Sequence, residues 1–119
     1  MNAHDLNKAM LDAVAELEQA QDEHRHQVLR AAEADRAMRI AEASAYLAAS
    51  GPVAERQAYV AKACAVERYA FKMADGLERS ALEAIRSRRQ ILSALQSLAA
   101  AQREEAHLAR YMDRELESA

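Results

Sequence analysis

The sequence is poor in the residues that build turns and strands. Its 119 residues include two Gly, one Pro, one Phe and no Trp. β-Sandwiches and barrels need a turn about every 8–12 positions and strands rich in β-branched and aromatic residues. Five Val and three Ile cannot furnish such a sheet. The composition therefore excludes these all-β architectures.

Several other features are missing. The single cysteine, Cys64, leaves no disulfide framework and no Cys-based metal site. No apolar run approaches the roughly 18 residues that a transmembrane helix requires. The segment MNAHDLNKAM lacks the basic region and apolar run of a signal peptide. We therefore expect a protein of the reducing cytoplasm with no membrane partner.

Helix formers, in contrast, are abundant. Alanine fills 30 positions, beside 12 Leu and 13 Arg, and these residues have the highest helix propensities. Apolar residues make up 51% of the chain, and about half of them are Ala. Alanine buries little area, so a thick core is not expected. The composition predicts long helices in close contact, assembled with further copies of the same chain.

A strong helix-breaking signal occurs only at Ser50-Gly51-Pro52, where Gly can end one helix and Pro can begin the next. We therefore expect a single helical domain over residues 1–119, with arms at 4–49 and 53–117 joined by a turn at 50–52. Gly76 is a possible break in the second arm, because Gly costs roughly 1 kcal/mol against Ala within a helix. The predicted fold is all-α: a long helical hairpin plus a C-terminal helix, coiled-coil-like and assembled as a homo-oligomer.

A seven-residue repeat runs along the first arm and predicts a coiled-coil seam. Small seam residues allow close approach of two helices. His24 and Gln27 interrupt it, as polar residues that fix register or oligomer state often do. One seam position repeats as Met10, Leu17, His24, Ala31, Met38 and Ala45, and its companion as Leu6, Ala13, Ala20, Gln27, Ala34, Ala41 and Ala48.

The densest apolar segment lies in the second arm and spans more than one face of a helix. Such a wide stripe is typical of a helix that contacts two neighbours, although a core within one chain is an alternative. The predicted oligomer interface comprises Leu82, Ile85, Ile91, Leu92, Leu95 and Leu98.

No pattern of catalytic residues stands out. Two glycines cannot form a glycine-rich phosphate loop. Glu23 with His26, and Glu104 with His107, have the Glu-x-x-His spacing of di-iron helical bundles. Each pair lies among charged residues, so we expect solvated helix faces. A di-metal helical enzyme is the least favoured hypothesis, and we expect no catalytic residue, cofactor or metal.

Basic residues carry the remaining chemistry. Arg outnumbers Lys 13 to 3, and the planar guanidinium binds phosphate and carboxylate through two parallel hydrogen bonds. Lys62, Arg68 and Lys72 are interleaved with Tyr59, Tyr69 and Phe71. That mixture suits single-stranded nucleic acid, where bases stack and cations meet phosphates. The alternative is that these basic residues lie on a solvent-exposed helix face, where they form salt bridges with acidic residues.

The stretch Arg79-Ser80-Ala81-Leu82-Glu83-Ala84-Ile85-Arg86-Ser87-Arg88, preceded by Ala48-Ala49-Ser50-Gly51, resembles the phage recombination mediators of the UvsY type. The resemblance spans roughly residues 35–105. It implies a non-enzymatic, ring-like homo-oligomer that binds single-stranded DNA. Such a protein helps a recombinase load onto DNA covered by single-strand-binding protein, in the cytoplasm of the phage's bacterial host.

On this resemblance, Arg86 and Arg88 match basic positions of the family's C-terminal helix. The family's Lys-x-Arg pair before the Ser-Gly turn is replaced by Ala43 and Ala45, so DNA contacts must come from elsewhere. The predicted DNA-binding residues are Arg36, Arg39, Arg79, Arg86, Arg88 and Arg89. The alternative function is a phage-type coiled-coil protein-interaction module, a scaffold or inhibitor, without DNA binding.

Overall fold

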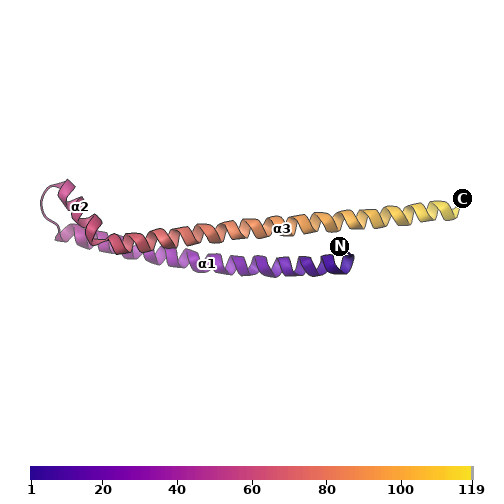
Figure 1. The fold of residues 1–119 in the computed structure, drawn as a ribbon, viewed down its shortest axis with the longest axis horizontal. Helices are drawn as coiled ribbons and strands as arrows, with labels where there is room; N and C mark the ends of the chain where they lie inside the picture. Colours follow the sequence, from indigo (N-terminus) through magenta and orange to yellow (C-terminus); the bar gives the residue numbers. More distant parts are fainter. Residues whose placement is uncertain (119) are drawn as a thin grey trace. The chain divides into compact units, whose positions relative to one another are not determined.

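The computed structural model describes residues 1–118, and every element in them is an α-helix (Figure 1). The helices are α1 (Ala3–Ala48), α2 (Val53–Ala63) and α3 (Ala65–Ser118). No strand occurs between residues 1 and 118, which confirms the predicted all-α class. The chain divides into two units, one of Met1–Ala20 with Ile85–Ala119 and the other of Gln21–Ala84.

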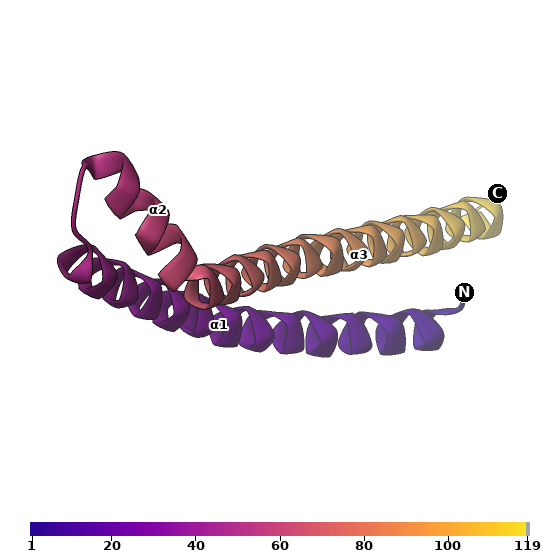
Figure 2. The ribbon, with the colours of Figure 1, turned by 60° about the vertical axis from the view of Figure 1, so that its left-hand side comes forward.

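The unit of residues 21–84 is a helical hairpin. The end of α1 turns through residues 49–52 into α2, and α2 leads back to the start of α3 (Figure 2). Gly51 has a φ of +99°, a conformation that L side chains rarely adopt, and Pro52 precedes the first residue of α2. The turn expected at residues 50–52 lies within this segment between α1 and α2.

The break in the second arm lies at Cys64 and not near Gly76. The backbone leaves the helical region at Cys64, with φ −105° and ψ 16°, although its N–H still donates to the Val60 carbonyl at 2.9 Å. The helix α3 continues through Gly76 without interruption. A helix interior tolerates one Gly because the cost of roughly 1 kcal/mol is small beside the packing of the flanking turns. The possible break near residue 76 is thus absent from α3.

The seven-residue repeat of α1 forms the contact with its neighbours, as the sequence predicts. Leu6 and Ala13 are buried in the unit that contains the N-terminus, and Gln27 and Ala31 are buried in the hairpin unit. The other residues of the repeat are half-buried, except Ala48, which is exposed. The small side chains of this seam thus serve close helix packing.

Helix α3 presents a matching seam, which we call the α3 seam. Its residues alternate at spacings of three and four, the pattern of a coiled coil. Beyond its last residue, the side chains of residues 103–118 are all exposed. The buried and half-buried residues of the α3 seam are Glu67, Phe71, Ala74, Glu78, Ala81, Ile85, Arg88, Leu92, Leu95, Ala99 and Gln102.

Polar contacts show that α1 and α3 run antiparallel in each unit. In the unit with the N-terminus, Arg88 pairs with Glu16, and Gln102 Nε2 donates to the Met1 carbonyl at 2.8 Å. In the hairpin unit, Arg68 Nε donates to Glu42 Oε1 at 2.9 Å. The predicted helical hairpin is consistent with these pairings.

Candidate nucleic-acid interface

The basic residues of α3 are concentrated on one stripe. Six of them directly follow a residue of the α3 seam, and Arg110 and Arg114 continue the same spacing beyond it. One residue along a helix is a rotation of about 100°, so the stripe lies beside the contact with α1 and faces solvent. Only Arg88, among the nine Arg and Lys residues of α3, lies elsewhere. This α3 basic stripe consists of Arg68, Lys72, Arg79, Arg86, Arg89, Arg103, Arg110 and Arg114.

Each unit carries a part of the stripe. Arg68, Lys72 and Arg79 belong to the hairpin unit, and the other five belong to the unit with the termini. All eight residues are exposed. The acids that share this spacing are Asp75 and Glu117, while the other acids of α3 occupy different faces. In each unit the cations of the stripe therefore outnumber its acids, in a chain whose net charge is −3.

Ion pairs on the stripe are exposed and exchangeable. Arg79 Nη2 lies 2.5 Å from Asp75 Oδ2, with 78% of the Arg side chain exposed. Arg68 pairs with Glu42 across the hairpin unit, with 43% of the Arg side chain exposed. Exposed pairs of this kind contribute about 0–1 kcal/mol. An incoming phosphate can replace such carboxylates at little cost.

The structure distributes the six predicted DNA-binding residues over three places. Arg79, Arg86 and Arg89 lie on the α3 basic stripe. Arg88, in contrast, lies on the α3 seam and is held by Glu16. Arg36 and Arg39 lie on α1, in the hairpin unit.

Sequence reasoning missed three cations of the stripe at the end of α3. Arg103, Arg110 and Arg114 were not among the predicted residues, although they keep the spacing of Arg86 and Arg89. They can be recognised because each directly follows a position of the three- and four-residue spacing of the α3 seam. That register becomes visible only when the contact with α1 is known.

A groove opens at the turn end of the hairpin unit, where α1, α2 and α3 meet. Its volume is about 590 Å³. Val60 is buried at its base, and Tyr46 stands beside it with 42% of its surface exposed. The guanidinium of Arg56 lies over the Tyr46 ring, 5.4 Å from its centroid. The residues that line this hairpin groove are Arg39, Glu42, Ala43, Tyr46, Leu47, Gln57, Val60 and Arg68.

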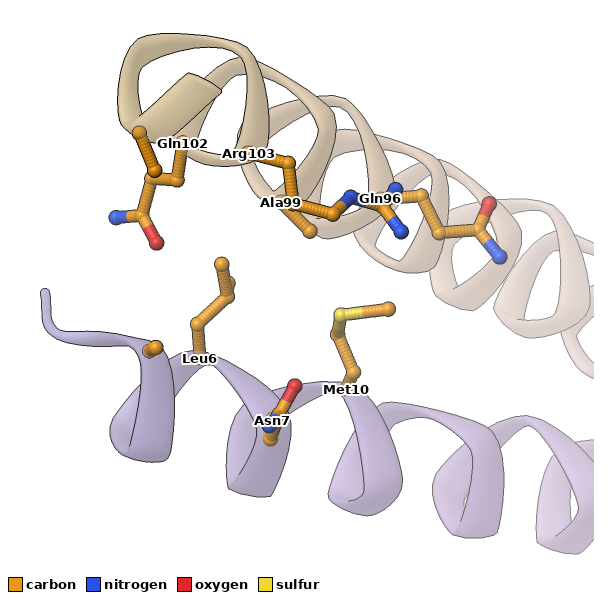
Figure 3. Close-up of a pocket in the computed structure, with 9 residues that line it drawn as sticks. Leu6, Asn7, Met10, Gln96, Ala99, Gln102 and Arg103 are labelled. Carbon is orange, nitrogen blue, oxygen red and sulfur yellow. The ribbon is translucent and has the colours of Figure 1, made fainter. Parts of the chain in front are cut away.

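A second groove lies between α1 and α3 in the unit with the termini (Figure 3). Its volume is about 680 Å³, and Leu6 and Met10 point from α1 toward Ala99 of α3. Asn7, Gln96 and Gln102 supply amides, and Arg103 supplies its charge. This lining offers hydrogen bonds and apolar contact but no pair of groups for acid–base chemistry.

Within residues 1–118, no group of three or more His, Cys, Asp or Glu side chains is arranged to hold a metal ion. Glu23, which has the Glu-x-x-His spacing with His26, accepts a hydrogen bond from Gln27 Nε2 at 2.7 Å.

None of the three helices as described has the length and apolar character needed to cross a membrane.

The residues predicted for an oligomer interface separate into two groups. Ile85, Leu92 and Leu95 belong to the α3 seam within the chain. Leu82, Ile91 and Leu98 are exposed. The wide apolar stripe of the second arm is thus shared between packing inside the chain and an open surface.

No family model matches this chain, and neither the curated proteins nor the solved structures contain a match.

Proposed function

We propose that this protein is a non-enzymatic recombination mediator that binds single-stranded DNA and helps load a recombinase onto DNA covered by single-strand-binding protein. The observation that supports this proposal is the α3 basic stripe, an exposed row of eight cations along one helix. Arg side chains bind phosphate through paired hydrogen bonds. Such contacts position a strand without reading its sequence, as a mediator acting on any single-stranded region requires.

Exchange of DNA is part of this function, and the electrostatics of the stripe suit it. The cations are exposed, and Arg68 and Arg79 pair with the carboxylates of Glu42 and Asp75. Each phosphate contact is then weak and salt-sensitive. A mediator that held DNA too tightly would block the recombinase that follows it. The recombinase and the single-strand-binding protein enter this proposal through the resemblance to UvsY-type mediators.

In a homo-oligomer, weak contacts between cations and phosphates are sufficient for DNA binding, because each further copy binds the same strand at high effective concentration. A second face of α3 is available for self-association. It comprises the residues that directly precede those of the α3 seam from Ala74 to Gln102, and none of them is charged. This uncharged face consists of Met73, Leu77, Ser80, Ala84, Ser87, Ile91, Ala94, Leu98 and Ala101.

The uncharged face and the basic stripe can act together because they lie on opposite sides of the α3 seam. Each is displaced from that seam by about 100°. Ile91 and Leu98 remain 43% and 41% exposed, and burial of such side chains favours association. Small residues such as Ser87 and Ala94 allow close approach of a second helix.

Binding of a labelled thymine oligonucleotide, measured by fluorescence anisotropy over a salt series, tests the proposal. We expect log K to fall linearly with log salt, by about 0.7 for each phosphate neutralised. The measurement should use the full chain at a concentration where its mass is known. Absence of binding at about 50 mM salt, where electrostatic contacts are strong, would overturn the proposal.

The uncharged face also favours a second candidate function, a coiled-coil protein-interaction module that acts as a scaffold or inhibitor. An exposed apolar face in a helical register is the usual docking surface for another helix. This module would form assemblies of defined mass and would not bind the oligonucleotide. The same salt series therefore separates the two functions.

A further inference from the structure

We infer that the hairpin groove receives a base of the bound single strand, with Tyr46 as the stacking platform. This inference rests on the proposed binding of single-stranded DNA and assigns it a specific site. The groove has the size range of ligand pockets, roughly 300–1,000 Å³, with about 590 Å³ of space. Three helices of one unit form it, so its walls are held in place by the hairpin.

The lining has the chemistry that a nucleotide needs. Val60 and Ala43 give an apolar base, and Leu47 remains 86% exposed at the edge. Tyr46 lines the groove, and the Arg56 guanidinium lies 5.4 Å from the centroid of its ring. A base that stacks on an aromatic ring inside such a groove is stabilised whatever its identity, because every base has a π-face.

Charge at the rim favours an anionic strand. Arg39 and Arg68 line the groove, and Arg56 lies beside it on Tyr46. Two acids face these three cations: Asp35 pairs with Arg39, and Glu42 pairs with Arg68. In both pairs the Arg side chain is more exposed than its half-buried carboxylate, at 76% for Arg39 and 43% for Arg68, so phosphates on either side of the stacked base can compete for the cations.

The groove is also continuous with the α3 basic stripe. Arg68 lines the groove and is at the same time the first residue of the stripe, followed by Lys72 one turn later. A strand held along this part of α3 therefore arrives at the groove with a phosphate near Arg68. The stripe supplies affinity without base contact, and the groove adds a contact that requires a base.

Photo-crosslinking locates the contact directly. The four tyrosines of the chain fall in four different tryptic peptides, and Tyr46 is the aromatic residue of residues 40–56. An oligonucleotide containing 5-bromodeoxyuridine, irradiated in complex with the full chain, should attach to this peptide. Attachment only to the peptides of Tyr59, Tyr69 or Tyr111 would overturn the groove while leaving DNA binding intact.

A comparison of two ligands separates stacking from charge. A thymine oligonucleotide and an abasic one of equal length have the same phosphates, and only the first has bases. Tyr46→Ala should weaken binding of the thymine oligonucleotide by about five- to hundredfold, the range expected for one lost stacking contact. It should leave binding of the abasic oligonucleotide unchanged.

Two further variants control this experiment. Tyr46→Phe keeps the ring and should bind as the unaltered protein does, whereas Tyr59→Ala removes an exposed tyrosine that does not line the groove. Helix content and melting temperature confirm that Tyr46→Ala is folded. Equal affinity of Tyr46→Ala and the unaltered protein for thymine would overturn the inference alone. Failure of the unaltered protein to bind either oligonucleotide would overturn the proposed function as well.

Discussion

Arg88 of α3 donates a hydrogen bond from Nη1 to Oε2 of Glu16 in α1, over 2.8 Å. The next residue, Arg89, points to the solvent side on the α3 basic stripe. The two arginines are adjacent in sequence and were predicted to share one role. Their places on the helix assign them different ones: Arg88 joins two helices, and Arg89 is available to a ligand.

These neighbours give a matched pair of variants for DNA binding. Arg89→Gln should weaken oligonucleotide binding and reduce the slope of log K against log salt by about 0.7, because one phosphate contact is lost. Arg88→Gln should change neither quantity and should lower the free energy of unfolding by less than about 1 kcal/mol, since its pair is partly exposed. Anisotropy titrations and urea unfolding measure both effects. A larger loss of affinity in Arg88→Gln than in Arg89→Gln would contradict the stripe.

Self-association is expected to depend on the uncharged face of α3. Ile91→Glu combined with Leu98→Glu places two charges there and should shift the mass in sedimentation equilibrium to that of a monomer. Leu11→Glu is the control, because Leu11 is equally apolar, 72% exposed and located on α1. Equal masses for both variants and the unaltered protein, or a monomeric unaltered protein, would show that this face does not join copies.

Much of the architecture could be predicted from the sequence because helical periodicity is a local property. The seam of α1 could be predicted from residue spacing, and the turn at Gly51 from the Gly51-Pro52 pair. The break at Cys64 did not, because it carries no Pro or Gly to mark it. The roles of Ile85 and Arg88 also escaped prediction, since residues one position apart lie on different faces and only the partner helix shows which face is covered.

The candidate interface was predictable only in part for the same reason. Arg79, Arg86 and Arg89 stood out as a cluster in sequence, whereas Arg103, Arg110 and Arg114 are spread over a longer stretch. The hairpin groove is built by residues from three helices, among them Tyr46, Val60 and Arg68. Residue spacing along the sequence does not predict that such residues lie together, because their contact depends on how the three helices of the hairpin unit pack.

Packing along the α3 seam predicts a large difference between two apolar residues three positions apart. Ile85 is 5% exposed and Leu82 is 36% exposed. Ile85→Ala should lower the free energy of unfolding by about 2–5 kcal/mol, the usual cost of truncating a buried aliphatic side chain. Leu82→Ala should cost much less. Urea unfolding at fixed protein concentration measures both, and similar values for the two would contradict the burial of Ile85.

The two glycines should respond in opposite directions to alanine. Gly76 lies within α3, and a Cβ there meets no atom within 4 Å, so Gly76→Ala should stabilise the fold by roughly 1 kcal/mol. Gly51→Ala should destabilise it, because the φ of +99° is strained for Ala and the new Cβ would lie 2.5 Å from Glu55 Oε2. Thermal melts read by circular dichroism give both signs. Stabilisation by Gly51→Ala would contradict the turn geometry.

Gln27 offers a test of the polar position in the α1 seam. It is 7% exposed, and its Nε2 donates to Glu23 while its Oε1 has no hydrogen-bond partner among the described residues. A half-satisfied buried amide costs stability, by about 1–3 kcal/mol for the unpaired group. Gln27→Leu should therefore raise the midpoint of urea unfolding, and Gln27→Glu should lower it because a charge is buried. A lower midpoint for Gln27→Leu would mean that the amide contributes more through its bond to Glu23 than its unpaired oxygen costs.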